Sequence, residues 1–273
     1  MRMIMITFDY HTHSNHSPDS TTLISDMLLR AIDIGITEYA ITDHMDFAYP
    51  ASIYASHNLL DAYVKDVQSA QKKFAGQINI LLGIEFGLRP DCAAVTSQIA
   101  ESYDFDFIIG SMHEDTKGFD FGFAQFFRGR TKREAYTTYF ESILETVNAC
   151  DAFDVLGHMD YIERYGRFED KSLHYKDYKE IIDEILKVVI AKGKGIEINT
   201  SGYAYGLGHP HPRLEILKRY KELGGEILTI GSDCHHPRAL AQHFEHVPAF
   251  LAAADIKYIT RFKKREPIFT KIL

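Results

Sequence analysis

The sequence predicts an α/β protein in which a parallel sheet closes into a barrel. Short apolar segments rich in Ile, Val, Phe and Tyr recur along the 273 residues, and segments with helical periodicity lie between them. Near-continuous apolar strands that alternate with helices are typical of a parallel sheet covered on both faces. Seven such units over about 250 residues favour a closed barrel over an open sheet. No Gly-x-Gly-x-x-Gly turn follows the first strand, as a dinucleotide-binding sheet would require.

The expected elements follow one another in a regular order. Strands are predicted at residues 3–11, 38–44, 79–87, 105–113, 153–160, 195–201 and 225–235. Helices are predicted at residues 22–35, 58–76, 91–102, 131–150, 177–193 and 212–225. Several of these helices end in Gly, the residue that most often follows a helix end. We expect one domain over residues 1–273, because neither a linker nor a low-complexity tract interrupts this pattern.

The composition argues against several classes of protein. A hydrophobic content of 45% is enough for a large core, and neither a signal peptide nor a segment of membrane-spanning length is present, so we expect a cytoplasmic protein. The net charge of −8 argues against binding to duplex nucleic acid, which needs a basic surface. Cys92, Cys150 and Cys234 are odd in number and widely spaced, which predicts buried thiols rather than disulfides.

Candidate metal ligands lie at or just past the carboxyl ends of the predicted strands, the face of a barrel that carries active sites. Six of the seven strands end in this way, and fourteen histidines are the one anomaly of the composition. The candidates at strand ends are His11, His13, His44, Glu85, His113, His158, Asp233 and His235. Residues two apart in a strand point to the same side, so His-x-His and Asp-x-His can each bind one ion. Asp19, in a Ser-Pro-Asp-Ser turn, is close enough in sequence to reach the same end of the barrel.

A mixed set of imidazoles and carboxylates predicts a multinuclear transition-metal centre. Taken alone, a histidine at a strand end is more often a hydrogen-bonded structural residue, and Asp19 is also an ordinary turn or helix-capping residue. The placement at six strand ends favours metal binding, because so many buried polar groups without ions would lack partners. The choice between Zn, Fe and Mn stays open.

The segments HTHSNHSPD, AITDH, GIEFG, GSMH, LGHMD and GSDCH, in this order, resemble the motifs of the PHP family, the polymerase and histidinol phosphatase metallohydrolases. The resemblance covers essentially the whole chain, and TKREAYTTYFESILETV and EINTSGY are most similar to the histidinol-phosphatase branch. It implies a distorted TIM-like barrel of seven β/α units with a metal site at the carboxyl face of the strands. It also implies two or three ions of Zn, Fe or Mn, held by the same nine residues, with Glu85 as a bridge.

The activity that the resemblance implies is the hydrolysis of a phosphomonoester, most simply L-histidinol phosphate in histidine biosynthesis. As a mechanism we expect a hydroxide that bridges two ions to attack phosphorus, while a third ion and Arg164 hold the other oxygens. Asp19, His44 and His235 are candidates for the group that assists the leaving alkoxide. Arg164, Arg213 and Asn199 are candidates for substrate binding, although both arginines are equally compatible with a solvated role and Asn199 with tying a loop.

One segment departs from the family pattern. After INTSG, many histidinol phosphatases carry a basic residue suited to phosphate, whereas this chain has Tyr203, Ala204 and Tyr205. The alternatives are therefore a phosphoesterase of the same family that acts on another small phosphoester or on phosphotyrosine, a non-catalytic metal-bound scaffold, and a nuclease, which the acidic composition disfavours. The expected partner is a small phosphorylated substrate, and binding to nucleic acid or to a membrane is not expected. The sequence does not indicate the oligomeric state.

Overall fold

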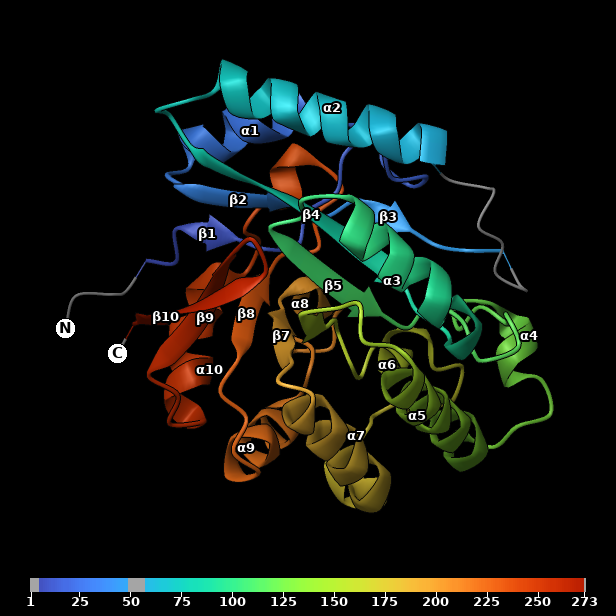
Figure 1. The fold of residues 1–273 in the computed structure, drawn as a ribbon. Coiled ribbons are helices and arrows are strands. Elements are labelled where there is room, and N and C mark those ends of the chain that lie inside the picture. Colours follow the sequence, from blue (N-terminus) through green and yellow to red (C-terminus); the bar gives the residue numbers. More distant parts are fainter. Residues whose placement is uncertain (1–4, 49–56, 273) are drawn as a thin grey trace.

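Seven parallel strands curl into a nearly closed barrel in the computed structural model, which describes residues 5–48 and 57–272 (Figure 1). The strands follow one another around the barrel in chain order: β1 (Phe8–Asp9), β2 (Glu38–Ile41), β4 (Asn79–Gly87), β5 (Phe107–Ser111), β6 (Val155–Leu156), β7 (Gly195–Asn199) and β8 (Leu228–Gly231). A short further strand, β3 (His44–Met45), pairs with β4 beyond the end of β2. All these pairings are parallel, so the predicted barrel is confirmed.

Backbone hydrogen bonds join β1 to β8 and bring the two ends of the sheet together. The N–H of Tyr10 donates to the carbonyl of Ile230 at 3.0 Å, and the N–H of Asp233 donates to the carbonyl of His11 at 2.8 Å. The N–H of His13 then donates to the carbonyl of Cys234 at 2.9 Å. Because these bonds continue past the last residues of both strands, the segments that follow β1 and β8 run side by side.

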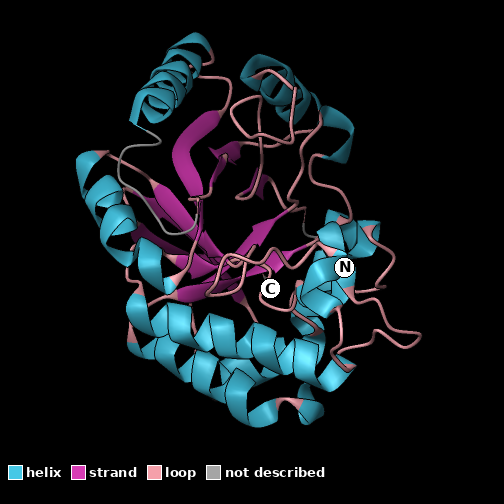
Figure 2. Cartoon of the chain, turned by 90° about the vertical axis from the view of Figure 1, so that its right-hand side faces the viewer, coloured by secondary structure: helices cyan, strands magenta, loops and turns pink. Residues whose placement is uncertain are grey.

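The helices lie outside the strands (Figure 2). Six of them agree with the predicted helices to within a few residues: α1 (Ile24–Asp33), α2 (His57–Lys73), α3 (Ala93–Ser102), α5 (Lys132–Ala149), α7 (Lys179–Ala191) and α9 (Leu214–Glu222). α5 begins with a capping box, in which Thr131 accepts the N–H of Glu134 and the Glu134 carboxylate accepts the N–H of Thr131. Shorter helices that the periodicity did not predict are α4 (Ala124–Phe127), α6 (Ile162–Tyr165), α8 (Ser201–Ala204) and α10 (Val247–Ala253), with single 3-10 turns at Pro90–Cys92, Tyr175–Asp177, Pro237–Ala239 and Phe244–His246.

Most of the observed strands are shorter than the predicted ones, whereas β4 has the predicted bounds. Residues 3 and 4 of the first predicted strand lie outside the described residues, and β1 and β6 pair over two residues each. The chain leaves the sheet before His113 and His158, which were predicted inside strands. Apolar composition therefore located the strands. Of the nine ligand-type residues, His44 and Glu85 lie in β3 and β4, and the others lie outside the strands.

A C-terminal hairpin that the sequence pattern did not predict covers the amino end of the barrel. It pairs β9 (Tyr258–Lys263) with β10 (Glu266–Lys271). The hydroxyl of Tyr10 accepts the N–H of Phe262 at 2.9 Å and donates to Glu38, the first residue of β2, at 2.5 Å. Arg265 pairs at 2.9 Å with Asp154, which precedes β6. The hairpin thus ties down the end of the barrel opposite to the predicted metal site.

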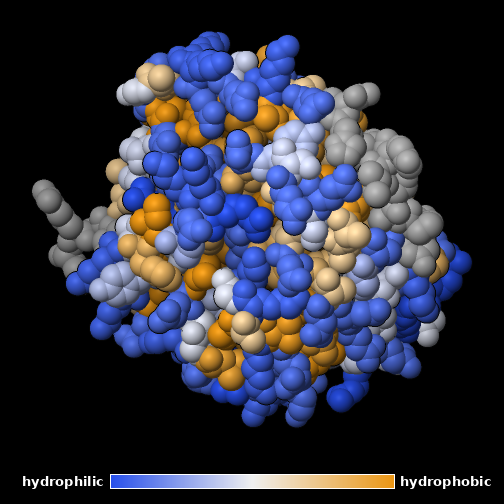
Figure 3. All heavy atoms as spheres, viewed as in Figure 1, coloured by the Kyte–Doolittle hydropathy of each residue, from blue (hydrophilic) through white to orange (hydrophobic). Residues whose placement is uncertain are grey.

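Buried side chains fill the barrel and the layer between strands and helices. The three cysteines are free and buried, as predicted. On the face shown in Figure 3, hydrophobic side chains lie in separate groups between hydrophilic ones. Within the described residues, none of the helices combines the length and the apolar character needed to cross a membrane.

Candidate metal centre

The nine predicted ligands converge at the carboxyl end of the barrel, which we call the mouth. Four of them stand two residues after the last residue of a strand: His11 after β1, His113 after β5, His158 after β6 and Asp233 after β8. Because side chains alternate along an extended chain, this common spacing sends all four in the same direction. The nine residues His11, His13, Asp19, His44, Glu85, His113, His158, Asp233 and His235 form what we call the ligand cluster.

Glu85 occupies the middle of the ligand cluster. It is fully buried in β4, and the register of β3 places His44 directly beside it. Its Oε2 atom lies 3.3 Å from His11 Nε2, 3.6 Å from His13 Nε2 and 2.8 Å from His44 Nδ1. Its Oε1 atom lies 3.1 Å from His158 Nε2 and 3.5 Å from His113 Nε2. Both carboxylate oxygens therefore face imidazoles, which is the placement that a bridging carboxylate needs.

Two other carboxylates complete the ligand cluster. Oδ1 of Asp233 lies 3.3 Å from His13 Nε2 and 3.6 Å from His11 Nε2. The backbone of Asp233 is left-handed, with φ of 55°, a conformation that aspartate tolerates better than most residues. Asp19 lies at the open side, where its Oδ2 is 3.0 Å from His235 Nε2 and 3.6 Å from His44 Nε2. The ligand cluster thus has a buried floor and an accessible side.

Several atoms of the ligand cluster are buried without a hydrogen-bond partner among the described residues: His11 Nε2, His13 Nε2, His44 Nδ1, Glu85 Oε2 and His235 Nε2. His44 Nδ1 and Glu85 Oε2 are only 2.8 Å apart, yet neither atom has a hydrogen-bond partner among the described residues. Unpartnered buried polar atoms cost free energy unless a ligand satisfies them. Sets of three ligand atoms that lie within 4.8 Å of one another include His13–His44–His235, His11–His158–Asp233, His11–His13–Glu85 and His44–Glu85–His113. The residues present therefore fit divalent transition-metal ions.

The charges within the ligand cluster are strongly coupled. Burial alone would raise the pKa of Glu85, but the imidazoles of His11 and His44 hold it well below its usual value. Burial would lower the pKa of His44, but Glu85 and Asp19 raise it to about 10. Burial, together with the neighbouring His44, lowers the pKa of His13 to about 3. Protons on some imidazoles therefore balance the carboxylates, and metal binding would release them.

A buried glutamate on β7 orients the histidines of the floor. Oε1 of Glu197 accepts the Nδ1–H of His11 at 2.6 Å, and Oε2 accepts the backbone N–H of His158 at 3.1 Å. Asn199 donates to Oε2 of Glu197 at 3.2 Å, and its own carbonyl accepts two hydrogen bonds from Ser201. Asn199 is fully buried and is not among the residues that line the cavity over the ligand cluster.

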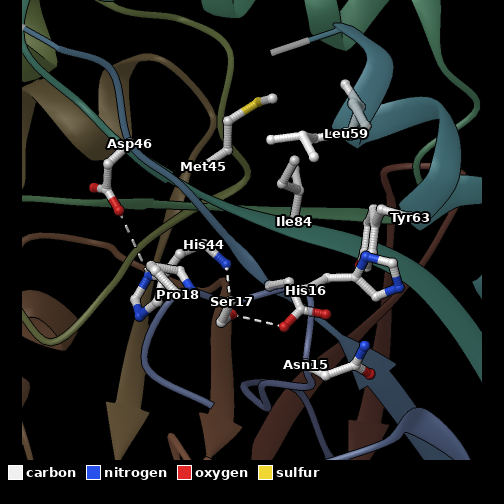
Figure 4. Close-up of a pocket in the computed structure, with 12 residues that line it drawn as sticks. Asn15, His16, Ser17, Pro18, His44, Met45, Asp46, Leu59, Tyr63 and Ile84 are labelled. Carbon is white, nitrogen blue, oxygen red and sulfur yellow. Dashed lines mark hydrogen bonds and ion pairs between the residues drawn. The ribbon is translucent and has the colours of Figure 1, made fainter. Parts of the chain in front are cut away.

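Further polar partners orient the histidines nearer the surface. Nδ1 of His13 lies 3.0 Å from the hydroxyl of Ser17, which donates to Asp43 at 2.6 Å. Nδ1 of His113 lies 2.8 Å from Oδ1 of Asp46. Such contacts fix which ring nitrogen is free to bind a metal. Figure 4 shows Ser17, His44 and Asp46 around a neighbouring pocket of about 460 Å³, whose wall toward the ligand cluster is His44.

A cavity of about 420 Å³ opens directly over the ligand cluster. Arg164, on α6, lines it together with Tyr161, Tyr165 and Tyr205. Among the described residues, no carboxylate forms an ion pair with Arg164, whose guanidinium is therefore available to an anion.

Arg213, a candidate for substrate binding, forms an ion pair with Glu163. Its Nη2 and Nε atoms bind Glu163 at 2.5 and 2.9 Å, and the side chain does not line the cavity. Two of its N–H donors are therefore used by the buried carboxylate of Glu163. Of the arginines and lysines in the described part of the chain, Arg164 lines the cavity over the ligand cluster.

Sequence reasoning missed several residues that shape the mouth. Asp46 lies two residues after His44, and Asp43 lies two residues after the end of β2, so the period of two that identified the ligands also marks these partners. The tyrosines Tyr161, Tyr165 and Tyr205 had no comparable signal, because they lie in loops and short helices whose paths the sequence does not define.

The family of the chain is indicated by sequence comparison. Residues 9–201 match the model of the PHP domain. The histidinol-phosphatase of Lactococcus lactis subsp. lactis is 33% identical over 238 residues, which cover 85% of each chain. A probable histidinol-phosphatase of Clostridium acetobutylicum is 30% identical over 263 residues, covering 95% of this chain and 98% of the relative.

Solved structures show the same fold. The crystal structure of histidinol phosphate phosphatase from Lactococcus lactis, in complex with zinc, L-histidinol and phosphate, superposes with a TM-score of 0.85 at 29% identity, over 96% of this chain and 98% of the other. A putative histidinol phosphatase from Listeria monocytogenes superposes with a TM-score of 0.74 at 24% identity, over 87% and 98% of the two chains.

Proposed function

This chain belongs to the PHP domain family, and we propose that within it the chain is a histidinol-phosphatase, a metal-dependent enzyme that hydrolyses L-histidinol phosphate to L-histidinol and phosphate. The observation that carries the proposal is the ligand cluster, in which buried imidazoles surround both oxygens of Glu85. Next to it is a cavity lined by Arg164, which forms no ion pair with a carboxylate of the described residues. The relative from Lactococcus lactis, crystallised with zinc, L-histidinol and phosphate, supports the choice of substrate.

The metal part of the proposal assigns two or three ions to the nine residues of the ligand cluster, with Glu85 as the bridge. Zinc is the first choice, because the solved relative contains it, and iron and manganese suit the same ligands. When bound, such ions lower the pKa of a coordinated water toward ~7 and neutralise phosphoryl oxygens.

The protein's own residues have separate tasks in the proposed reaction. Water supplies the oxygen that forms the new bond to phosphorus, the bond from phosphorus to the alcohol oxygen breaks, and the leaving alkoxide takes up a proton. Asp19 and His235 lie on the open side of the ligand cluster, with His44 next to them, and are placed to assist that proton transfer. Arg164 donates hydrogen bonds to the phosphoryl oxygens.

The same proposal covers the organisation and location of the protein. We infer one PHP-type barrel domain over residues 1–273, because the matched region and the strands of the barrel extend through most of the chain. Three free, buried cysteines support a reducing compartment, the cytoplasm.

The experiment that tests the proposal compares substrates. Zinc-reconstituted protein is assayed with L-histidinol phosphate, glycerol phosphate, a nucleoside monophosphate and a phosphotyrosine peptide, each over a range of concentrations. We expect kcat/KM for L-histidinol phosphate to exceed the others by about 100-fold or more, since the cavity must recognise the alcohol as well as the phosphate. Equal values across the panel would instead favour a phosphoesterase of broad specificity.

A further inference from the structure

The ring of Tyr205 stacks on the guanidinium of Arg164 at the mouth. Cζ of Arg164 lies 3.3 Å from the centre of the Tyr205 ring and 4.9 Å from the centre of the Tyr165 ring. The hydroxyls of Tyr165 and Tyr161 are 2.9 Å apart, and the ring of Tyr161 stacks on His158 with centres 4.6 Å apart. A chain of aromatic contacts therefore leads from a predicted metal ligand to Arg164.

The stacked partners come from neighbouring loops of the barrel. Arg164 lies in α6, which follows β6, and Tyr205 directly follows α8, which follows β7. A guanidinium carries its N–H donors in its plane, so a ring that covers its face leaves the donors free. Since no carboxylate among the described residues pairs with Arg164, stacking is the contact that fixes its orientation without occupying its donors.

The packing of Tyr205 differs from that of the tyrosine two residues earlier. The ring of Tyr203 packs on His243 and His246, with centres 5.5 and 4.8 Å apart, and does not line the cavity. Tyr205 lines the cavity while 44% of its surface stays exposed. The ring of Tyr205 is therefore partly exposed and contacts Arg164 in the cavity. It contributes less to the packing of the core than to the wall of the cavity.

We propose that Tyr205 is a positioning residue, which holds the guanidinium of Arg164 in place for the phosphoryl group of the substrate. The inference rests on the proposed function and assigns a role at the same phosphate site to Tyr205. A free arginine side chain loses rotamer freedom when it binds an anion, and a stack that orders the side chain beforehand removes that cost. Tyr205 thus acts through Arg164 and makes no bond to phosphate itself.

A double-mutant cycle tests the inference. Tyr205→Ala, Tyr205→Phe, Arg164→Ala and the double variant Arg164→Ala/Tyr205→Ala are compared with the parent protein, and Tyr203→Ala is the matched control. Two quantities are measured on zinc-loaded protein: the dissociation constant of inorganic phosphate by calorimetry, and kcat/KM for L-histidinol phosphate. Zinc content is measured for every variant to show that the ligand cluster is intact.

We expect Tyr205→Ala to weaken phosphate binding and lower kcat/KM by about 3- to 30-fold, the range of a stacked cation contact. Tyr205→Phe, which keeps the ring, and Tyr203→Ala should stay within about twofold of the parent. In the Arg164→Ala background, Tyr205→Ala should have no further effect. An equal loss in both backgrounds would overturn the inference, and so would an unchanged phosphate affinity in Tyr205→Ala. If L-histidinol phosphate is not hydrolysed, phosphate binding still measures the coupling between Arg164 and Tyr205. A failure of the inference can therefore be distinguished from a failure of the proposed function.

Discussion

Nδ1 of His11 lies 2.6 Å from Oε1 of Glu197, although 186 positions separate the two residues in the chain. The contact joins the loop after β1 to β7, and both side chains are buried. Because Nδ1–H donates to the carboxylate, Nε2 is the ring nitrogen that faces Glu85 and Asp233. Glu197 therefore decides which nitrogen of His11 is offered to a metal.

Replacing Glu197 by Gln should weaken metal binding without unfolding the protein. The amide keeps the shape and one acceptor but removes the charge, so we expect zinc affinity to fall by about 10- to 100-fold. Competition with a chromophoric chelator measures the affinity. Glu180→Gln, at an exposed position in the first turn of α7, is the control. Equal affinities in the two variants would show that Glu197 has no part in orienting His11.

Removing the charge of Arg164 should reduce catalysis. Arg164→Gln deletes hydrogen bonds to a charged group, and we expect kcat/KM for L-histidinol phosphate to fall by about 10- to 100-fold. Arg167→Gln is the matched control, because this exposed arginine contacts the carbonyl of Gly122 outside the cavity. A loss of similar size in both variants would point to a general effect of charge on the protein rather than to a contact with phosphate.

The pairing of Glu163 with Arg213 should make stability depend on acid pH. Burial alone would raise the pKa of Glu163, but Arg213 and His209 lower it to about 2. A carboxyl whose pKa is lower in the folded state stabilises the fold above its unfolded pKa of about 4.3, and this contribution disappears as the pH falls to about 2. The lowered pKa corresponds to a contribution of Glu163 to the free energy of unfolding on the order of 3 kcal/mol.

Urea unfolding of the parent protein and Glu163→Gln at pH 7 and pH 3 measures this contribution. The difference in unfolding free energy between the two proteins should be large at pH 7 and should shrink at pH 3. Comparing the two proteins at each pH removes the effect of other titrating groups that they share. A difference that is the same at both pH values would mean that the ionised carboxylate of Glu163 does not stabilise the fold.

The C-terminal hairpin should matter for stability and not for chemistry. Tyr10→Phe removes the hydroxyl that accepts the N–H of Phe262 and donates to Glu38. A buried donor without its partner costs about 1–3 kcal/mol, and we expect a loss of this size in thermal or urea unfolding. Zinc content and kcat should be unchanged, since the hairpin lies at the opposite end of the barrel from the ligand cluster. A variant of normal stability that has lost its zinc would contradict this separation.

The barrel could be predicted from the sequence because most of its strand segments are mainly apolar. β4 and β5, for example, are almost entirely buried, and the helices between strands show a regular apolar stripe. The hairpin could not be predicted in this way. β10 is exposed at five of six positions, so hydrophobic burial leaves no pattern in its sequence.

The residues of the ligand cluster could be predicted because parallel strands bring their carboxyl ends together. His11 and His158 are 147 positions apart, yet both follow a strand by two residues and their rings lie 5.7 Å apart. The residues that contact the substrate are harder to predict. Of the candidates, Arg213 pairs with Glu163, and Asn199 is fully buried. Whether a polar side chain meets the cavity or a buried partner such as Glu163 depends on the path of each loop, which local sequence does not determine.

The most direct test of the account is the zinc content per chain of protein purified without chelator and equilibrated with zinc, for the parent and for Glu85→Ala. Glu85 contacts imidazoles through both oxygens, so its loss should affect more than one ion. We predict two or three tightly bound ions in the parent and at least one fewer in Glu85→Ala. Less than one ion per chain in the parent, or an unchanged content in Glu85→Ala, would contradict a metal centre built around Glu85.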